Sequence, residues 1–390
     1  MNSLRNKMPD QIISSSFSVF GTDALKSAVE HIKSCGFQRA LLLADAASAK
    51  NGIPGKVSSL LAQGRIVYQI FDRIAPSASL SDVRSAAEAA RSFRADILIA
   101  AGGGAAADAA KAVSLLAADP ALSDAIRNGG TALPVKNALP LYIVFSSAGN
   151  ARDVSGLFVL EDEVQRKKIE CSHEKAVPSG LVFDSGCIAC APSKDFSAGS
   201  ASILAAAVES VVCKKAWGIS QLHALEAVKL VFENARPAAK GNAKAKEQIL
   251  AAQYLAGIAA ASSGYAMGTA VANSLEALCG IPFQTASSIL LPEVMKFNAS
   301  STGAKYRDIA AAMGARVSQA ARPDAFRKAA VHAVEKLLKE LAVPKKFSSL
   351  VLSEEDMQLL QDTVMKAPQT ETNPKAVTKK KIAEMIKSLS

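Results

Sequence analysis

The 390-residue sequence is poor in aromatic residues and lacks long apolar runs. Phe, Tyr and Trp together make up 5% of the chain, with a single Trp. A helix needs about 20 consecutive apolar residues to cross a bilayer, and no such run is present, so we expect no membrane span. The amino-terminal stretch MNSLRNKMPDQIISSSF also lacks the apolar segment of a signal peptide. These absences predict a cytoplasmic protein.

The formal net charge is +10, and most of the positive excess lies in the second half of the chain. Part of it is the run Lys379–Lys381, in a stretch that is typical of an amphipathic terminal helix. Nucleic-acid binding usually combines basic residues with aromatic side chains, which are scarce here. We therefore expect a small-molecule substrate and neither nucleic acid nor a membrane as partner.

The six cysteines include one C-x-x-C pair, Cys187 and Cys190, in the sequence CIAC. A zinc ribbon needs two such pairs, and a redox motif of the thioredoxin type normally opens a helix after a strand. We interpret the pair as structural thiols, with a metal or redox role as the alternative.

Short apolar runs alternate with helical patterns in the first half of the chain, as in a parallel sheet covered by helices. The expected strands lie at 39–45, 65–71, 96–101, 139–145 and 180–184. From about Ala191 only helical periodicity remains. The sequence thus predicts an α/β, Rossmann-like domain over residues 1–190, an all-helical domain over 191–390, and an active-site cleft between them.

The stretch ILIAAGGGAAADAAKAV (Ile97–Val113) reads as a buried strand, three glycines and an alanine-rich helix. Glycines at such a joint let backbone N–H groups converge at the positive end of the helix dipole, which suits a phosphate or pyrophosphate. The spacing is not G-x-G-x-x-G, so the usual dinucleotide fingerprint is absent. A tight turn formed only for packing is the alternative.

Several segments along nearly the whole chain resemble the iron-containing (group III) alcohol dehydrogenases, relatives of glycerol dehydrogenase and dehydroquinate synthase. GGGAAADAAK is similar to the family's G-G-G-S-x-x-D-x-x-K, FSVFGTDAL to its opening, and FSSAGNARD to P-T-T-A-G-T-G-S-E. ILLPEVMKFN and ETNPKAVTKKKIAEMI resemble landmarks of its helical domain. The resemblance implies a dehydroquinate synthase-like fold and a homodimer or larger homo-oligomer.

The resemblance also implies an NAD(P) site. Its candidate residues are Asp45, Gly102, Gly103, Gly104, Asp108, Ser146, Ser147 and Lys168. The glycines and Asp108 would hold the pyrophosphate and nicotinamide end, and the two serines replace two threonines of the family. Lys168 would lie near the nicotinamide ribose, unless it belongs to a solvated run of charges.

Asp45 lies where an acidic residue can accept hydrogen bonds from the adenosine ribose and repel a 2′-phosphate, so we expect NAD, with NADP possible. A strand-end turn is the alternative role for Asp45. Arg152 departs from the family pattern, because it places a large cation where a small hydroxyl is usual.

In the family, the metal is held by an Asp and a His at i and i+4 on one helix and by two further histidines. The four positions fall here on Ser202, Ala206, Thr269 and Phe283, and an additional family histidine becomes Asn273. Methyl, phenyl and hydroxyl groups are poor substitutes for imidazole and carboxylate. We therefore expect no metal. The chain's own histidines lie elsewhere: His31, His173, His223 and His332.

The family uses its metal as a Lewis acid that stabilises the alkoxide from which hydride leaves. The resemblance and the lost ligands together predict a metal-independent NAD(P)-dependent oxidoreductase that acts on a small carbonyl or alcohol. Candidate catalytic residues are Lys168, Thr269 and Asn273, with Arg152 as a further polarising group. The alternatives are a catalytically silent nucleotide-binding or scaffold protein and a non-redox enzyme on the same fold.

Overall fold

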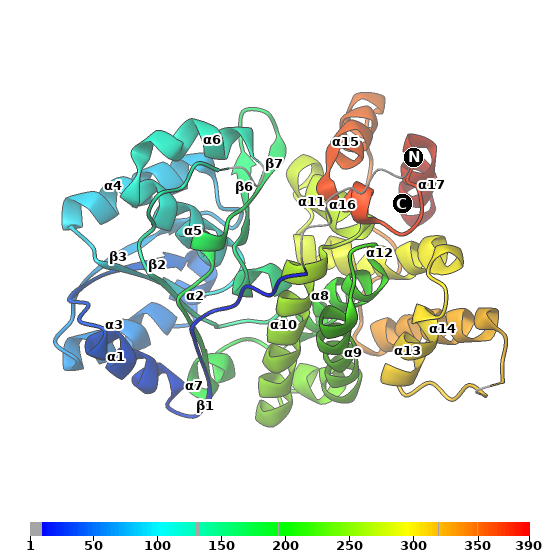
Figure 1. Cartoon of the computed structure of the whole chain (residues 1–390), viewed down its shortest axis with the longest axis horizontal. Helices are drawn as coiled ribbons and strands as arrows, with labels where there is room; N and C mark the ends of the chain where they lie inside the picture. Colours follow the sequence, from blue (N-terminus) through cyan, green and yellow to red (C-terminus); the bar gives the residue numbers. More distant parts are fainter. Residues whose placement is uncertain (1–9, 130–132, 194, 319, 349) are drawn as a thin grey trace.

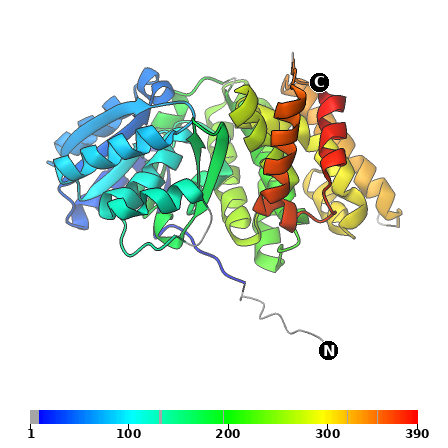
Figure 2. The same ribbon diagram turned by 90° about the horizontal axis from the view of Figure 1, so that it is seen from above.

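The computed structural model describes residues 10–129, 133–193, 195–318, 320–348 and 350–390. It consists of an α/β half and a helical half that lie side by side (Figure 1), and the view from above shows the same two halves (Figure 2). The α/β half contains the amino-terminal part of the chain, and helices α8 to α17 form the other half.

A six-stranded parallel sheet forms the centre of the α/β half, in the order β1-β8-β5-β4-β2-β3. Its strands are β1 (Phe17–Gly21), β2 (Arg39–Asp45), β3 (Val67–Ile74), β4 (Ile97–Ala101), β5 (Leu141–Val144) and β8 (Gly180–Asp184). All five expected strands are present. The central strand β4 is buried at every position, as expected of a parallel sheet with both faces covered.

Helices cover both faces of this sheet. They are α1 (Ala24–Ser34), α2 (Ala46–Lys50), α3 (Ile53–Gln63), α4 (Leu80–Phe93), α5 (Ala105–Ala118), α6 (Ser123–Asn128) and α7 (Ser185–Ala189). Side chains of β2 alternate between two apolar clusters: Leu41 and Leu43 belong to one, Ala40 and Leu42 to the other. This alternation follows from the two-residue period of a strand.

Three strands had no counterpart among the expected elements: β1, and the antiparallel pair β6 (Leu157–Asp162) and β7 (Lys167–Ser172). β7 has the sequence KKIECS, in which charged residues hide the strand pattern. β1 is a sheet edge whose residues are at most half-buried, so its apolar signal is short.

The second half of the described chain contains only helices. The longer ones are α8 (Asp195–Val212), α9 (Gly218–Ala239), α10 (Ala243–Ser263), α11 (Met267–Cys279), α12 (Phe283–Asn298), α13 (Lys305–Ala312), α14 (Pro323–Glu340), α15 (Glu354–Lys366) and α17 (Lys379–Leu389), with the short α16 (Pro368–Thr372). α8 is long and apolar enough to cross a bilayer, but 83% of it is buried inside the protein, as in a core helix.

The helical half holds the loop that follows β5 in place. Gln253 of α10 accepts a hydrogen bond from the Gly149 N–H (2.9 Å) and donates one to the Asn150 carbonyl (3.0 Å). A Cβ atom on Gly257 would lie 2.2 Å from the Ala151 carbonyl oxygen, so only glycine allows this close approach. The loop is thereby fixed between the sheet and α10.

Candidate active site

A cleft of about 300 Å³ runs from the carboxyl ends of the strands to α11 and α12 of the helical half. Six of the eight candidate cofactor residues line it: Asp45, Gly103, Gly104, Asp108, Ser147 and Lys168. Gly102 and Ser146 adjoin these residues in the chain but do not belong to the cleft lining. A crevice at this edge of a parallel sheet is the usual place for a nucleotide.

The three glycines connect β4 to α5, and two of them, Gly103 and Gly104, lie against the buried carboxylate of Asp153. The Gly104 N–H donates to Asp153 Oδ2 (2.9 Å), and a Cβ atom on Gly103 would lie 3.0 Å from the same oxygen. Gly102 and Gly104 have φ of 143° and 56°, a region that favours glycine. The glycine segment therefore separates the cleft from an internal acid. Gly103 and Gly104 contact Asp153 and also line the cleft.

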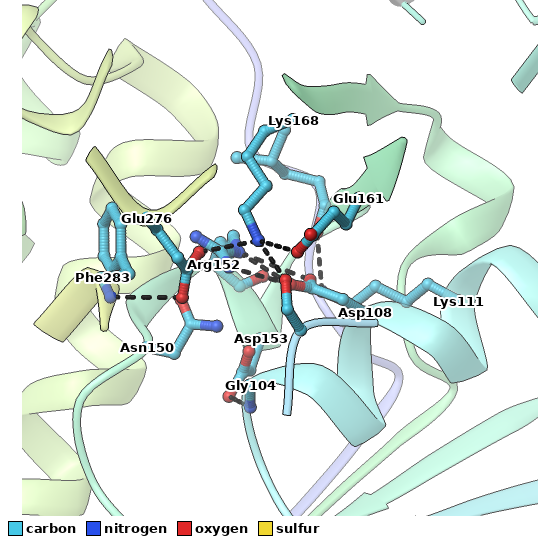
Figure 3. A network of polar contacts seen from close by, with 12 residues as sticks. Gly104, Asp108, Lys111, Asn150, Arg152, Asp153, Glu161, Lys168, Glu276 and Phe283 are labelled. Carbon is cyan, nitrogen blue, oxygen red and sulfur yellow. Dashed lines mark hydrogen bonds and ion pairs between the residues drawn. The ribbon is translucent and has the colours of Figure 1, made fainter. Parts of the chain in front are cut away.

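Asp108 forms a buried ion pair with Arg152 (Figure 3). Its Oδ2 accepts hydrogen bonds from Arg152 Nε (3.0 Å) and Nη2 (2.9 Å). Lys111, one turn further along α5, donates to the carbonyl oxygens of Arg152 and Leu157, both at 2.8 Å. Asp108 thus lines the cleft while paired with Arg152, and Lys111 fixes the backbone of that arginine.

Burial shifts the titration of the two remaining charged groups in this cluster. It raises the pKa of Asp153 to about 7, because nearby Lys111 and the Gly104 amide only partly offset the loss of solvation. It also lowers the pKa of Lys111 to about 8. A change in the charge of either residue is therefore expected to shift the pKa of the other. Asp153 was not among the residues expected at the site, although it directly follows Arg152 in FSSAGNARD, the segment that departs from the family pattern.

Lys168 lies at the end of the cleft between the two halves of the molecule. Its Nζ is 3.0 Å from Glu276 Oε2 of α11 and 3.4 Å from Glu161 Oε2 of β6, and it also donates to Ser77. Only 7% of its side chain is exposed, so it is not part of a solvated run. Figure 3 shows these side chains converging around the ammonium group.

Asp45 forms the strand-end turn that the sequence offered as an alternative, and it also lies in the cleft. Its Oδ1 accepts a hydrogen bond from the Ser48 N–H (2.7 Å), which caps the amino terminus of α2. The same side chain lines the cleft. A carboxylate at this place is fixed in orientation by the cap.

A second, much smaller cavity of about 20 Å³ lies where helices of the helical half meet the α/β half. It brings together the four positions that the resemblance assigned to metal ligands: Ser202, Ala206, Thr269 and Phe283. Asn273 also lines it. Two hydroxyls, a methyl group and a phenyl ring do not fit Fe²⁺ or Zn²⁺, which prefer imidazole, thiolate and carboxylate. Among the described residues, no cluster of three or more His, Cys, Asp or Glu could replace them.

Glu209 is the carboxylate of this cavity. Its Oε2 accepts hydrogen bonds from Thr269 Oγ1 (2.7 Å) and the Ala266 N–H (3.1 Å). Its Oε1 and the Oδ1 of Asn273 are buried without a hydrogen-bond partner within the described part of the chain. Burial raises the pKa of Glu209. Glu209 therefore holds its proton more tightly than an exposed carboxyl group does, and one of its two oxygens has no hydrogen-bond partner in the described part of the chain.

Four residues line both the cleft and the small cavity: Asn150, Arg152, Val159 and Phe283. The Arg152 guanidinium lies 5.0 Å from the centre of the Phe283 ring. Arg152 therefore lies at the junction between the predicted cofactor site and the four positions that the resemblance assigned to metal ligands.

Comparison with known proteins agrees with this architecture. The family profile described as iron-containing alcohol dehydrogenase matches residues 15–185, and the profile of the carboxyl-terminal part of Fe-containing alcohol dehydrogenases matches residues 197–390. The chain is 28% identical to lactaldehyde reductase of Escherichia coli (strain K12) over 97% of this chain and 99% of that protein.

Solved structures show the same fold. A crystal structure of 1,3-propanediol oxidoreductase superimposes with a TM-score of 0.92 at 24% identity, covering 98% of this chain and all of the other. Sulfoacetaldehyde reductase from Bifidobacterium kashiwanohense, solved in complex with NAD+, gives a TM-score of 0.85 at 20% identity, with coverage of 98% and 99%.

Proposed function

The chain belongs to the iron-containing alcohol dehydrogenase family, and from this premise we propose that it is an oxidoreductase that uses NAD(H) and no metal ion. Its substrate is a small aldehyde, ketone or alcohol. One observation carries the proposal: six candidate cofactor residues share one cleft, while the four metal positions surround a cavity without a suitable donor set.

The cofactor, when bound, supplies or accepts a hydride at its nicotinamide ring. Gly103 and Ser147 shape the floor of the cleft on which the diphosphate would rest. Asp45 is oriented by its helix cap to accept hydrogen bonds from ribose hydroxyls. Lys168, held by Glu276 and Glu161, keeps a positive charge at the far end of the cleft.

Reduction of a carbonyl also consumes a proton at the oxygen atom. Glu209 can provide it, because its Oε2 already accepts two hydrogen bonds and the proton of the neutral acid then belongs on Oε1, beside the cavity. Thr269 fixes this orientation, and Arg152 can polarise the carbonyl from the cleft side. Together they would replace part of the charge stabilisation that the family obtains from its metal.

Glu209→Gln is expected to reduce kcat for carbonyl reduction by about 10²-fold or more, because the amide cannot supply a proton. In the unchanged protein, the rate should fall as pH rises through the raised pKa of Glu209, where the acid becomes a carboxylate. The variant should lose this pH dependence. Initial rates across pH, with saturating NADH and varied substrate, measure both effects.

Ser210→Ala is the matched control for a change on α8, since Ser210 is buried and, among the described residues, its hydroxyl bonds only to the carbonyls of Ala206 and Gly264. It should leave kcat and the pH profile unchanged. If Glu209→Gln keeps both the rate and the pH profile of the original protein while binding NADH normally, Glu209 is not the proton donor.

Asp45→Asn is expected to shift the preference between NADH and NADPH by about tenfold towards NADPH, equivalent to about 1.4 kcal/mol. Asparagine caps a helix as well as aspartate does, so α2 should persist while the negative charge is removed. The ratio of the two dissociation constants, from fluorescence titration, tests this. Asp119→Asn, at a cap far from the cleft, should not change the ratio. An unchanged ratio in Asp45→Asn would remove Asp45 from the ribose site.

The proposed function is tested with NADH and short aldehydes, including lactaldehyde, which the name of a relative suggests as a substrate class. We expect NADH binding in the micromolar range and substrate-dependent NADH oxidation that survives treatment with a chelator. Activity lost on chelation and restored by Fe²⁺ or Zn²⁺ would refute metal independence. Absence of NADH and NADPH binding would favour the scaffold alternative.

A further inference from the structure

We propose that Cys190, with Lys56 and Cys187 beside it, is a thiol-oxidation site that reacts with hydroperoxides and closes a Cys187–Cys190 disulfide. The sequence alone favoured structural thiols here, because a C-x-x-C pair without further signals is uninformative. The structure adds a basic partner from another element. Lys56, on α3, lies 3.1 Å from Cys190 Sγ through its Nζ atom.

The three groups have distinct environments. Cys190 is partly exposed, whereas Cys187 is fully buried in the apolar cluster on that face of the sheet. Lys56 Nζ also donates to the Gly186 carbonyl (2.8 Å), which fixes the ammonium beside the sulfur atom. The Cys190 thiol can itself donate to the same carbonyl (3.3 Å), so Lys56 is the partner that remains when the proton leaves.

Thiolates are the form of cysteine that attacks peroxides, and reactive cysteines usually have a basic group beside the sulfur atom. Cys190 is partly exposed and has the Lys56 ammonium group 3.1 Å from its sulfur atom, whereas Cys187 is buried. Burial, together with the Asp184 carboxylate, raises the pKa of Cys187 to about 12. The Asp184 Oδ1 atom accepts hydrogen bonds from the N–H groups of Gly186 and Cys187 and so stays close to that thiol. The geometry therefore assigns Cys190 as the attacking sulfur and Cys187 as the resolving one.

The chemistry balances in two steps. The Cys190 thiolate attacks one oxygen of hydrogen peroxide and forms an S–O bond while the O–O bond breaks. Hydroxide is the leaving group, and Cys190 becomes a sulfenic acid. The Cys187 thiol then forms the S–S bond, the S–O bond breaks, and water leaves. A hydrogen bond from the Cys190 N–H to the Cys187 carbonyl (3.2 Å) shows that the two residues occupy one helical turn. Their Cα atoms are then about 5 Å apart, within the range that a disulfide bridges.

The site lies on the segment that joins the two halves of the molecule. α7, which contains Cys187, follows the last strand of the sheet, and Ser185 of the same helix is hydrogen-bonded to Glu247 of α10. The site is separate from the cleft, so its test does not depend on the proposed function.

The test treats the full-length protein with limiting hydrogen peroxide, alkylates the remaining thiols and identifies the peptides by mass. Trypsin releases one peptide, residues 176–194, that contains Cys187 and Cys190 and no other cysteine. We expect this peptide to lose two hydrogen atoms before exposed Cys35, the internal control, is modified. In Cys187→Ser, dimedone should trap a sulfenic acid on Cys190.

Lys56→Met should slow oxidation of Cys190 about tenfold, because it removes the basic group that contacts the attacking sulfur atom, and Lys56→Arg should retain most of the rate. Lys26→Met, which removes another exposed lysine nearby, is the matched control. The proposal is overturned if Cys35 reacts as fast as Cys190, or if Lys56→Met reacts as fast as the original protein. Recovery of a sulfenic acid without the disulfide in the original protein would remove Cys187 from the second step.

Discussion

Asp108→Asn is expected to lower the free energy of unfolding by about 3–5 kcal/mol, the usual cost of leaving a buried charge without its partner. The Asp108 and Arg152 side chains are only 2% and 10% exposed, and three hydrogen bonds join them. Burial disfavours the charged guanidinium, but Asp108, Glu276 and Asp153 together outweigh this effect and raise the pKa of Arg152. An arginine side chain does not lose its proton near neutral pH, so Arg152 stays charged when Asp108 is neutralised. Urea unfolding at neutral pH measures the loss.

The matched control is Asp324→Asn, which breaks an ion pair with Arg327 whose aspartate is 77% exposed. It should cost no more than about 1 kcal/mol. The double variant Asp108→Asn/Arg152→Met should recover much of the lost stability, because both charges are then gone. If Asp108→Asn alone lowers the free energy of unfolding by less than about 1 kcal/mol, the pair is solvated or another acid pairs with Arg152. Either result would contradict the buried Asp108–Arg152 pair described above.

The parts of the fold that follow from local pattern could be predicted from the sequence. The periodicity and composition of the sequence predict the apolar strands of the sheet and the long helices. The clearest signal is the apolar run of β4 followed by three glycines. β7 could not be recognised, because its charged residues face partners from elsewhere in the chain: Lys168 meets Glu276 of α11, more than a hundred residues away. Such pairs depend on tertiary packing, which no local pattern contains.

Some features of the candidate site could likewise be predicted from the sequence, whereas others depend on tertiary packing. The resemblance placed Ser202, Ala206, Thr269 and Phe283 at one centre, and the structure indeed groups them around one cavity. The resemblance did not reveal that Asp153 lies beneath the glycine joint or that Glu209 has one free oxygen. These features arise from a carboxylate buried between elements, and burial is a property of the folded chain.

A four-residue replacement is expected to create a zinc site at the four positions whose present side chains are not usual zinc ligands. The substitutions are Ser202→Asp, Ala206→His, Thr269→His and Phe283→His. Residues 202 and 206 are one turn apart on α8, so both new side chains would point from one helix face. Loss of the Phe283 ring gives space, and Glu209, freed from Thr269, can orient a new imidazole as carboxylates commonly do at zinc sites.

The variant should bind Zn²⁺ with a dissociation constant of about 1 μM or tighter, and Zn²⁺ at a hundred times that value should then stabilise it by about 2.7 kcal/mol. Calorimetric titration and the zinc dependence of the melting temperature measure these effects. The original protein, and a triple variant that keeps Ala206, should show neither effect at the same Zn²⁺ concentration, because their ligand sets are absent or incomplete. A folded four-residue variant without zinc binding would show that the four positions do not surround one centre. Equally tight, saturable zinc binding by the original protein would show that other residues already supply a metal site. A metal-independent mechanism with Glu209 as proton donor would then no longer be needed.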